Sequence, residues 1–193
     1  SSMPLSPLQS FNKGIWGIKP RNKEQSFALE LLMDPDIQIV TLVGKAGSGK
    51  TLCAIAAGLQ QTVDDFMTKG DPVYDRLIVS RPVQPLGKDI GFLPGTMEEK
   101  MRPWLAPIQD NLQFLMGNDK TTLEMYLERG RIEIEALTYI RGRSIANALI
   151  IIDESQNLTM HELKTIITRV GEGSKIILTG DVEQIDNVYV DET

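Results

Sequence analysis

The octapeptide GKAGSGKT at residues 44–51 constrains the fold of this chain more than any other part of its sequence. It matches the pattern G-x-x-x-x-G-K-[ST], in which a glycine-rich loop turns its backbone N–H groups toward phosphate oxygens. Such a loop needs a buried strand before it and a helix after it, and both are predicted here. Residues 37–43 (IQIVTLV) form an apolar, β-branched run, and residues 50–66 have a helical pattern of small and apolar residues.

Each residue type of this loop has a chemical role. The glycines let the backbone curl, and the helix that follows adds the positive end of its dipole. Lys50 is expected to reach the β- and γ-phosphates of a nucleotide, and Thr51 to offer its hydroxyl to Mg²⁺. The predicted nucleotide-binding residues of this segment are Gly44, Lys45, Ala46, Gly47, Ser48, Gly49, Lys50, Thr51 and Leu52.

A second motif consists of two acids, Asp153 and Glu154, directly after the apolar run at residues 149–152. Ligands bind at the carboxyl edge of a parallel sheet, where a strand such as this one ends. Asp153 is expected to hold the water shell of Mg²⁺, and Glu154 to orient or deprotonate an attacking water. The competing interpretation is an acid that caps the next helix, and it is less favoured because Thr159 fills that role better.

A third motif, TGDVEQ at residues 179–184, follows the last predicted strand at residues 176–178. A polar cluster just past an apolar strand is again expected at the ligand edge. One interpretation is a sensor of the γ-phosphate, in which Gln184 or Asp181 contacts the attacking water or Mg²⁺. An ordinary β-turn accounts for the same residues equally well.

The remaining pattern alternates strands with helices, which indicates an α/β fold with a mostly parallel central sheet flanked by helices. Residues 96–116 have helical periodicity, but Pro103 and Pro107 predict a break into two short helices. Residues 1–20 are rich in Ser, Pro and Gly and are expected to form a linker before one domain at residues 21–193. The apolar side chains available to dock this linker on the domain are those of Phe11, Ile15, Trp16 and Ile18.

Composition limits which kinds of site and which cellular location this domain can have. The chain has a single cysteine, Cys53, and a single histidine, His161. These counts argue against a disulfide framework, a Cys- or His-based metal cluster and a Ser-His-Asp triad. Cys53 is expected to be a small buried hydrophobe. No apolar run approaches the ~20 residues of a transmembrane helix, and no signal peptide is evident, so a cytoplasmic protein without a membrane partner is expected. The net charge of −6 argues against binding nucleic acid by bulk charge, although a local basic rim is compatible with it.

The motifs GKAGSGKT, LIIIDESQN and TGDVEQID, in this order, resemble the RecA-type core of superfamily 1 helicases. Residues 81–108 (RPVQPLGKDIGFLPGTMEEKMRPWLAPI) and 138–157 (TYIRGRSIANALIIIDESQN) resemble the PhoH-like ATPase family, and the similarity spans about residues 20–187. This resemblance implies a RecA-like P-loop NTPase, an Mg²⁺-dependent ATPase with RNA helicase or remodelling activity that usually assembles as a hexameric ring. Residues 14–29 are most similar to members in which a PIN-type ribonuclease precedes the ATPase, so a truncated or excised ATPase domain of such a protein is expected.

The resemblance also implies roles for residues outside the three motifs. Gln25 matches a glutamine that reads the adenine edge, although a solvated helix glutamine explains it without any ligand. Arg143, or else Arg141 or Arg169, is expected to act in trans on ATP held by a neighbouring subunit. For Arg141 and Arg143 the alternatives are contacts to RNA phosphates and a solvated basic loop, and for Arg169 the helix dipole alone explains a cation.

A local basic rim is predicted in and after the Pro/Gly-rich segment at residues 81–95. Phe92 and Trp104 are candidates for stacking on single-stranded RNA, but packing within the segment is the favoured explanation for both. The cations of this predicted rim are Arg81, Lys88, Lys100 and Arg102.

The sequence therefore favours ATP hydrolysis coupled to RNA unwinding or remodelling. The alternative is a nucleotide-dependent assembly or switch module that organises a partner ribonuclease without translocation. A small-molecule kinase shares the phosphate-binding loop, but Glu154 beside Asp153 suits activation of water rather than of another acceptor.

Overall fold

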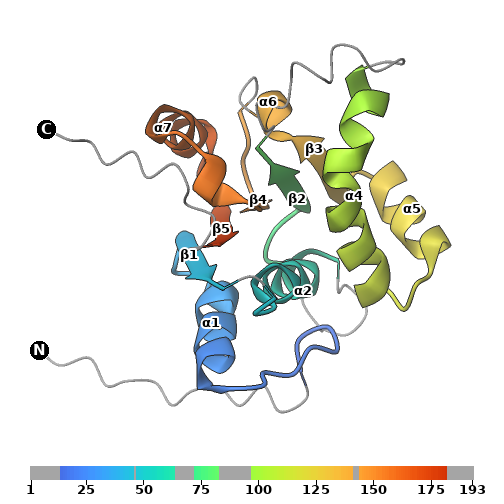
Figure 1. The fold of residues 1–193 in the computed structure, drawn as a ribbon, viewed down its shortest axis with the longest axis vertical. Coiled ribbons are helices and arrows are strands. Elements are labelled where there is room, and N and C mark those ends of the chain that lie inside the picture. The colour runs from blue at the N-terminus through green and yellow to red at the C-terminus, as the bar shows by residue number, and fades with distance from the viewer. Residues whose placement is uncertain (1–13, 46, 64–71, 83–96, 141–143, 182–193) are drawn as a thin grey trace, which may run out of the picture.

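The computed structural model describes residues 14–45, 47–63, 72–82, 97–140 and 144–181, and these form a three-layered α/β unit (Figure 1). Its centre is a five-stranded sheet with the strand order β1-β5-β4-β2-β3, and every neighbouring pair is parallel. The strands are β1 (Ile39–Gly44), β2 (Arg76–Arg81), β3 (Ile132–Ala136), β4 (Ala148–Ile152) and β5 (Lys175–Asp181). The predicted α/β class with a parallel sheet is confirmed.

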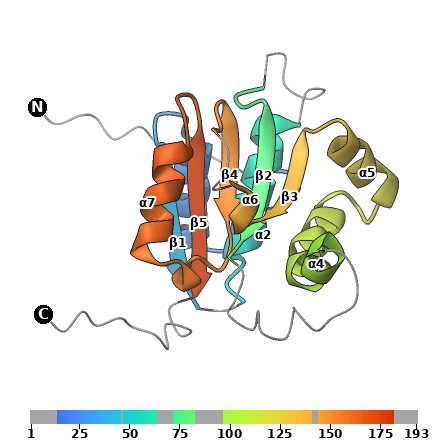
Figure 2. The same ribbon diagram turned by 90° about the horizontal axis from the view of Figure 1, so that it is seen from above.

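The helices cover both faces of this sheet, because parallel strands joined by crossovers bury both of their faces (Figure 2). One layer holds α1 (Lys23–Met33) and α2 (Lys50–Thr62), with α4 (Met97–Leu115) and α5 (Lys120–Glu128) beside them toward β3. The other layer holds α6 (Leu137–Ile140) and α7 (Met160–Arg169), which follows the short 3₁₀ helix η1 (Ser155–Asn157). Every residue of β4 is buried, as expected for a central strand.

Strand β5 lies between β1 and β4, so the strand before the glycine-rich loop and the strand before the two acids are both its neighbours. The sequence predicted this last strand over residues 176–178, but it continues to Asp181. Thr179 and Gly180 are therefore paired residues of the strand rather than members of a turn, opposite Leu42 and Val43.

Helix α4 corrects a sequence-based prediction, because Met97–Leu115 is one helix that contains both Pro103 and Pro107. The two prolines are four positions apart and both are exposed, so they lie on one side of α4, away from the core. The opposite side of α4 buries Ile108 and Leu112 completely in the core. Burial of two such side chains stabilises the helix by about 1.5–3 kcal/mol each, which offsets much of the cost of the prolines.

Residues 14–18 pack against the domain, as the sequence predicted for Ile15 and Trp16. Ile15 is buried and pairs its backbone with Ile18, and the indole Nε1 of Trp16 donates to the carbonyl oxygen of Leu115 at 2.9 Å. The boundary between a linker and the domain at residues 20 and 21 stays a prediction. No helix within the described ranges is long and apolar enough to cross a bilayer.

A buried lysine ties α1 to the sheet. Lys175, at the start of β5, is fully buried, and its Nζ donates to the carbonyl oxygens of Leu31 and Asp34 at 2.8 and 2.7 Å. These carbonyls lie at the C-terminal end of α1, where helix carbonyls lack partners within the helix. Burial lowers the pKa of Lys175 to about 8, and the nearby charge of Asp34 opposes that shift.

Candidate nucleotide site

The loop between β1 and α2 has the backbone geometry of an anion site. Gly47 and Gly49 have φ angles of +79° and +78°, the left-handed region that favours glycine. Gly49 is the N-cap of α2 and supplies no side-chain hydrogen bond, so no side chain caps the first turn of the helix. An N-terminus without a side-chain cap leaves backbone N–H groups and the positive dipole end for an anion.

Lys50 points back into this loop and is surrounded by oxygen atoms. Its Nζ lies 2.9 Å from the Gly44 carbonyl oxygen, 2.8 Å from the Lys45 carbonyl oxygen and 3.2 Å from the Ser48 hydroxyl. The fourth neighbour is Oδ1 of Asp181 at the end of β5, at 2.7 Å, in an ion pair that is largely shielded from solvent. The lysine is thus held where a phosphate would meet it, and Asp181 occupies the place of an anion.

Thr51 and Asp153 come together as the sequence predicted for a metal site. Oδ1 of Asp153 accepts hydrogen bonds from the hydroxyls of Thr51 and Thr179, both at 2.9 Å. A hydroxyl and a carboxylate oxygen at this spacing fit Mg²⁺, which takes one or two protein oxygens and keeps waters and phosphate oxygens as its other ligands. The described residues contain no group of three or more His, Cys, Asp or Glu side chains suited to a metal, so an all-protein metal cage is not found there.

Glu154 lies next to this pair in an uncommon backbone conformation. Its φ is +56°, which a side chain other than glycine seldom adopts and which is typical of functional sites. Its Oε1 accepts from Arg81 Nη2 at 2.9 Å, and its Oε2 accepts from Gln156 Nε2 at 2.6 Å. The carboxylate is therefore held from two sides.

These groups line one cavity of about 240 Å³ at the carboxyl edge of the sheet. Asn111 of α4 adds a polar group to its wall that the sequence did not single out. A Cβ on Gly180 would lie 2.8 Å from the Gln156 amide oxygen, so a larger residue there would shift the Gln156 side chain. The lining residues are Gly47, Ser48, Gly49, Lys50, Thr51, Leu52, Asn111, Asp153, Glu154, Gly180 and Asp181.

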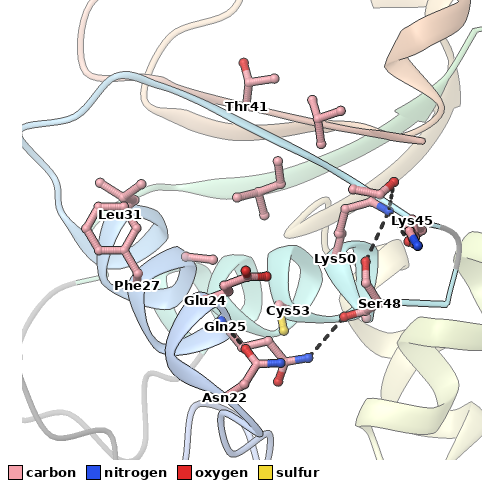
Figure 3. Close-up of a pocket in the computed structure, with 15 residues that line it drawn as sticks. Asn22, Glu24, Gln25, Phe27, Leu31, Thr41, Lys45, Ser48, Lys50 and Cys53 are labelled. Carbon is pink, nitrogen blue, oxygen red and sulfur yellow. Dashed lines mark hydrogen bonds between the residues drawn. The ribbon is translucent and has the colours of Figure 1, made fainter. Parts of the chain in front are cut away.

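A second cavity, of about 630 Å³, lies on the other side of the loop between α1, β1 and α2 (Figure 3). Gln25 of α1 points to the loop, and its Nε2 donates to the Ser48 carbonyl oxygen at 3.0 Å while its Oε1 accepts from the Arg21 N–H. Phe27 and Leu31 supply apolar wall, so the cavity has the character expected for a planar base. The adenine contact of Gln25 stays a prediction.

Cys53 lies on the wall of this second cavity and is buried. Burial raises the pKa of its thiol, and the positive charge of Arg21 opposes the shift only in part. The expectation of a small buried hydrophobe is confirmed.

Arg81 corrects the predicted basic rim. It is the last residue of β2, and its guanidinium is largely buried against both acids, with Nε 3.3 Å from Asp153 Oδ2 and Nη2 2.9 Å from Glu154 Oε1. Its assignment to an exposed rim for RNA is therefore wrong. A signal for its true place existed, because a charged residue that ends a buried strand lies at the ligand edge.

Other predicted residues lie elsewhere. Arg169 ends α7, and its carbonyl oxygen accepts from the N–H of Ile145 ahead of β4, so it lies at the opposite edge of the sheet from the loop. Arg102 is exposed on α4, and Trp104 is half-buried. The predicted residues outside the described ranges are Phe11, Ala46, Lys88, Phe92, Arg141, Arg143 and Gln184, and the side chain of Lys100 is not described either.

A glycine-rich loop between a buried strand and a helix, with a lysine at its centre and acids at the end of a nearby strand, defines a P-loop NTPase fold and nucleotide site. The family model described as "PhoH-like protein" matches residues 17–192, and the chain belongs to this family. The predicted resemblance to the PhoH-like family is confirmed, and the preceding PIN-type domain stays a prediction.

Curated relatives agree with this assignment. The chain is 59% identical over 189 residues to Protein PhoH2 of Bacillus subtilis, covering 97% of this chain and 41% of that protein. It is 39% identical over 180 residues to Protein PhoH2 of Thermobispora bispora, covering 93% of this chain and 39% of that protein. The chain thus spans about two fifths of the length of these relatives. Among solved structures, the large terminase of a thermophilic bacteriophage aligns with a TM-score of 0.47 and 13% identity, covering 84% of this chain and 39% of that one.

Proposed function

We propose that this chain binds ATP with Mg²⁺ in the cavity beside Lys50 and hydrolyses it. The observation that carries the proposal is that Glu154 faces the same cavity as the glycine-rich loop and lies next to the Thr51–Asp153 pair. A carboxylate in that position is suited to a water that attacks the γ-phosphate. The second cavity, beside Gln25, has the volume and the apolar wall for the base.

Each residue then has a defined task in hydrolysis. Lys50 and the loop N–H groups bind the β- and γ-phosphate oxygens, and Lys50 exchanges Asp181 for phosphate. Thr51 and Asp153 hold Mg²⁺, which supplies positive charge against the charge that builds on the phosphates. Glu154 orients a water and accepts its proton while the oxygen of that water bonds to the γ-phosphorus and the bond to the ADP oxygen breaks.

We infer further that hydrolysis is coupled to unwinding or remodelling of single-stranded RNA by a cytoplasmic, hexameric assembly in which Arg143 of one subunit serves the ATP of the next. The family resemblance supports this coupling to RNA. Arg102, a residue of the predicted basic rim, is exposed on α4, as contact with RNA phosphates would require. The net charge of −6 favours the alternative, a nucleotide-dependent assembly module for a PIN-type nuclease domain in the full-length protein.

Measuring phosphate release from ATP tests both the proposed hydrolysis and its proposed coupling to RNA. Lys50→Ala is expected to abolish turnover, and Glu154→Gln to retain ATP binding but lower kcat by about 10²–10⁴-fold, the usual contribution of a general base. Turnover by Glu154→Gln at the parent rate would contradict the role of Glu154. Stimulation by single-stranded RNA would support the helicase function, whereas turnover indifferent to RNA in an assembled ring would favour the assembly module.

A further inference from the structure

Arg81 connects the two acids of the nucleotide site to a helix outside it. Beyond its contacts with Asp153 and Glu154, its Nη1 donates to the carbonyl oxygen of Trp104 on α4 at 3.0 Å. A guanidinium is planar and presents its donors in a fixed fork. The three partners are therefore held in one relative arrangement by a single rigid group.

Helix α4 carries its two prolines on either side of this contact. Pro103 and Pro107 flank Trp104 and remove two backbone donors from the helix. Prolines are the usual sites at which helices bend. One turn further on, Ile108 and Leu112 anchor α4 in the core, and Asn111 reaches the wall of the phosphate cavity.

Glu154 depends on Arg81 for its position. It follows Asp153 directly in sequence, and Arg81 contacts both carboxylates, so the two negative charges lie close together around one guanidinium. Without Arg81, the Gln156 amide would be the remaining hydrogen-bond donor to the Glu154 carboxylate within the described residues, on a backbone already in the left-handed region. Repulsion from Asp153 would then displace it.

We propose that Arg81 is a positioning residue that makes the placement of Glu154 depend on the placement of α4. The proposal rests on the proposed function, because it concerns how the water-orienting acid of that site is set. A nucleotide that recruits Asp153 and Thr51 changes the partners of Arg81 and thereby moves α4 at Trp104. By reciprocity, a ligand that shifts α4 changes the nucleotide site by the same coupling free energy.

Tryptophan fluorescence tests the link without requiring turnover. The chain has two tryptophans, so Trp16→Phe leaves Trp104 as the sole reporter, directly at the contact. In this background a non-hydrolysable ATP analogue with Mg²⁺ is expected to change Trp104 emission. Arg81→Ala is expected to abolish that change while the analogue, measured separately by calorimetry, binds within about threefold of the parent. Arg76→Ala is the matched control, because Arg76 begins the same strand and pairs with Glu133 instead.

Kinetics provide the second readout. Arg81→Ala is expected to lower kcat about 10–100-fold with KM for ATP within about threefold, since a small misplacement of a catalytic group costs up to about 10²-fold. Arg81→Lys, which keeps the charge, is expected to recover part of the loss. In a Glu154→Gln background, Arg81→Ala is expected to cause no further loss, because both changes act through one carboxylate.

The outcomes separate this proposal from the function on which it rests. A parent that binds and hydrolyses ATP, with an Arg81→Ala variant that retains the Trp104 response or the parent kcat, overturns the proposal alone. Losses that multiply in the double variant also overturn it. A parent that binds no nucleotide rejects the proposed function and the role of Arg81 together. Should Arg81→Ala fail to fold, Arg81→Gln, which keeps a long side chain but removes the charge, decides by the same criteria in the same assays.

Discussion

The ion pair between Lys50 and Asp181 predicts that Asp181 weakens phosphate binding, because it competes with phosphate for Lys50. The two charges are 2.7 Å apart, and the side chains are 13% and 16% exposed, so solvent screens them only in part. At an effective dielectric constant of about 20, unit charges at this distance attract by roughly 6 kcal/mol. Desolvation and the three other oxygen contacts of Lys50 offset most of this energy, and about 1–2 kcal/mol remains for a pair that is largely but not fully buried.

An incoming phosphate must displace Asp181 from Lys50 and tolerate its negative charge. Asp181→Asn is therefore expected to tighten binding of ADP in the absence of Mg²⁺ by about 5–30-fold, the equivalent of 1–2 kcal/mol. Calorimetric titration with Mg²⁺ chelated measures this directly. Asp75→Asn is the control, because it makes the same change in net charge on an exposed residue ahead of β2. Unchanged or weaker ADP binding by Asp181→Asn would refute the competition between Asp181 and phosphate.

Two further predictions concern assembly and pH. If Arg143 acts in trans, mixing Arg143→Ala chains with Lys50→Ala chains should restore phosphate release, because some mixed interfaces hold one intact site; no rescue in mixtures shown to co-assemble would count against it. Because the pKa of Lys175 falls to about 8 on folding from 10.5, the unfolded chain binds more protons between these values, so the free energy of unfolding should rise from pH 8 to 10.5. Urea titrations between pH 8 and 10.5 should show this rise in the free energy of unfolding for the parent and not for Lys175→Met. If the two proteins show the same pH dependence, Lys175 does not titrate as inferred.

The convergence of the loop with the two acids could be predicted from the sequence. Each of the motifs follows an apolar run, and the carboxyl ends of parallel strands share one edge of the sheet. That rule alone placed Lys50, Thr51, Asp153 and Glu154 together. It could not pair Lys50 with Asp181, because the contact joins residues 131 positions apart and depends on β5 being the neighbour of β1.

Sequence rules failed where tertiary packing outweighed a local preference. Pro103 and Pro107 are strong local signals for a helix end, but the buried stripe of Ile108 and Leu112 keeps α4 continuous. The composition of the segment that Arg81 opens favours an exposed basic rim, but its position as the last residue of β2 decides its partners. In both cases the deciding quantity was burial against elements distant in sequence.

The strand order also determines how the two halves of the site communicate. Because β5 lies between β1 and β4, its last residues contact both: Thr179 bonds to Asp153, and Asp181 bonds to Lys50. Gln156 extends the contact, since its amide oxygen accepts from the Asp181 N–H and its Nε2 donates to Glu154. A phosphate that draws Lys50 from Asp181 therefore acts on one end of a continuous set of hydrogen bonds, and Arg81 with α4 forms the other end. Asp181→Asn and Arg81→Ala interrupt this set at opposite ends, so the loss of the nucleotide-dependent Trp104 response in both variants would show that the displacement of Asp181 reaches α4 through these hydrogen bonds.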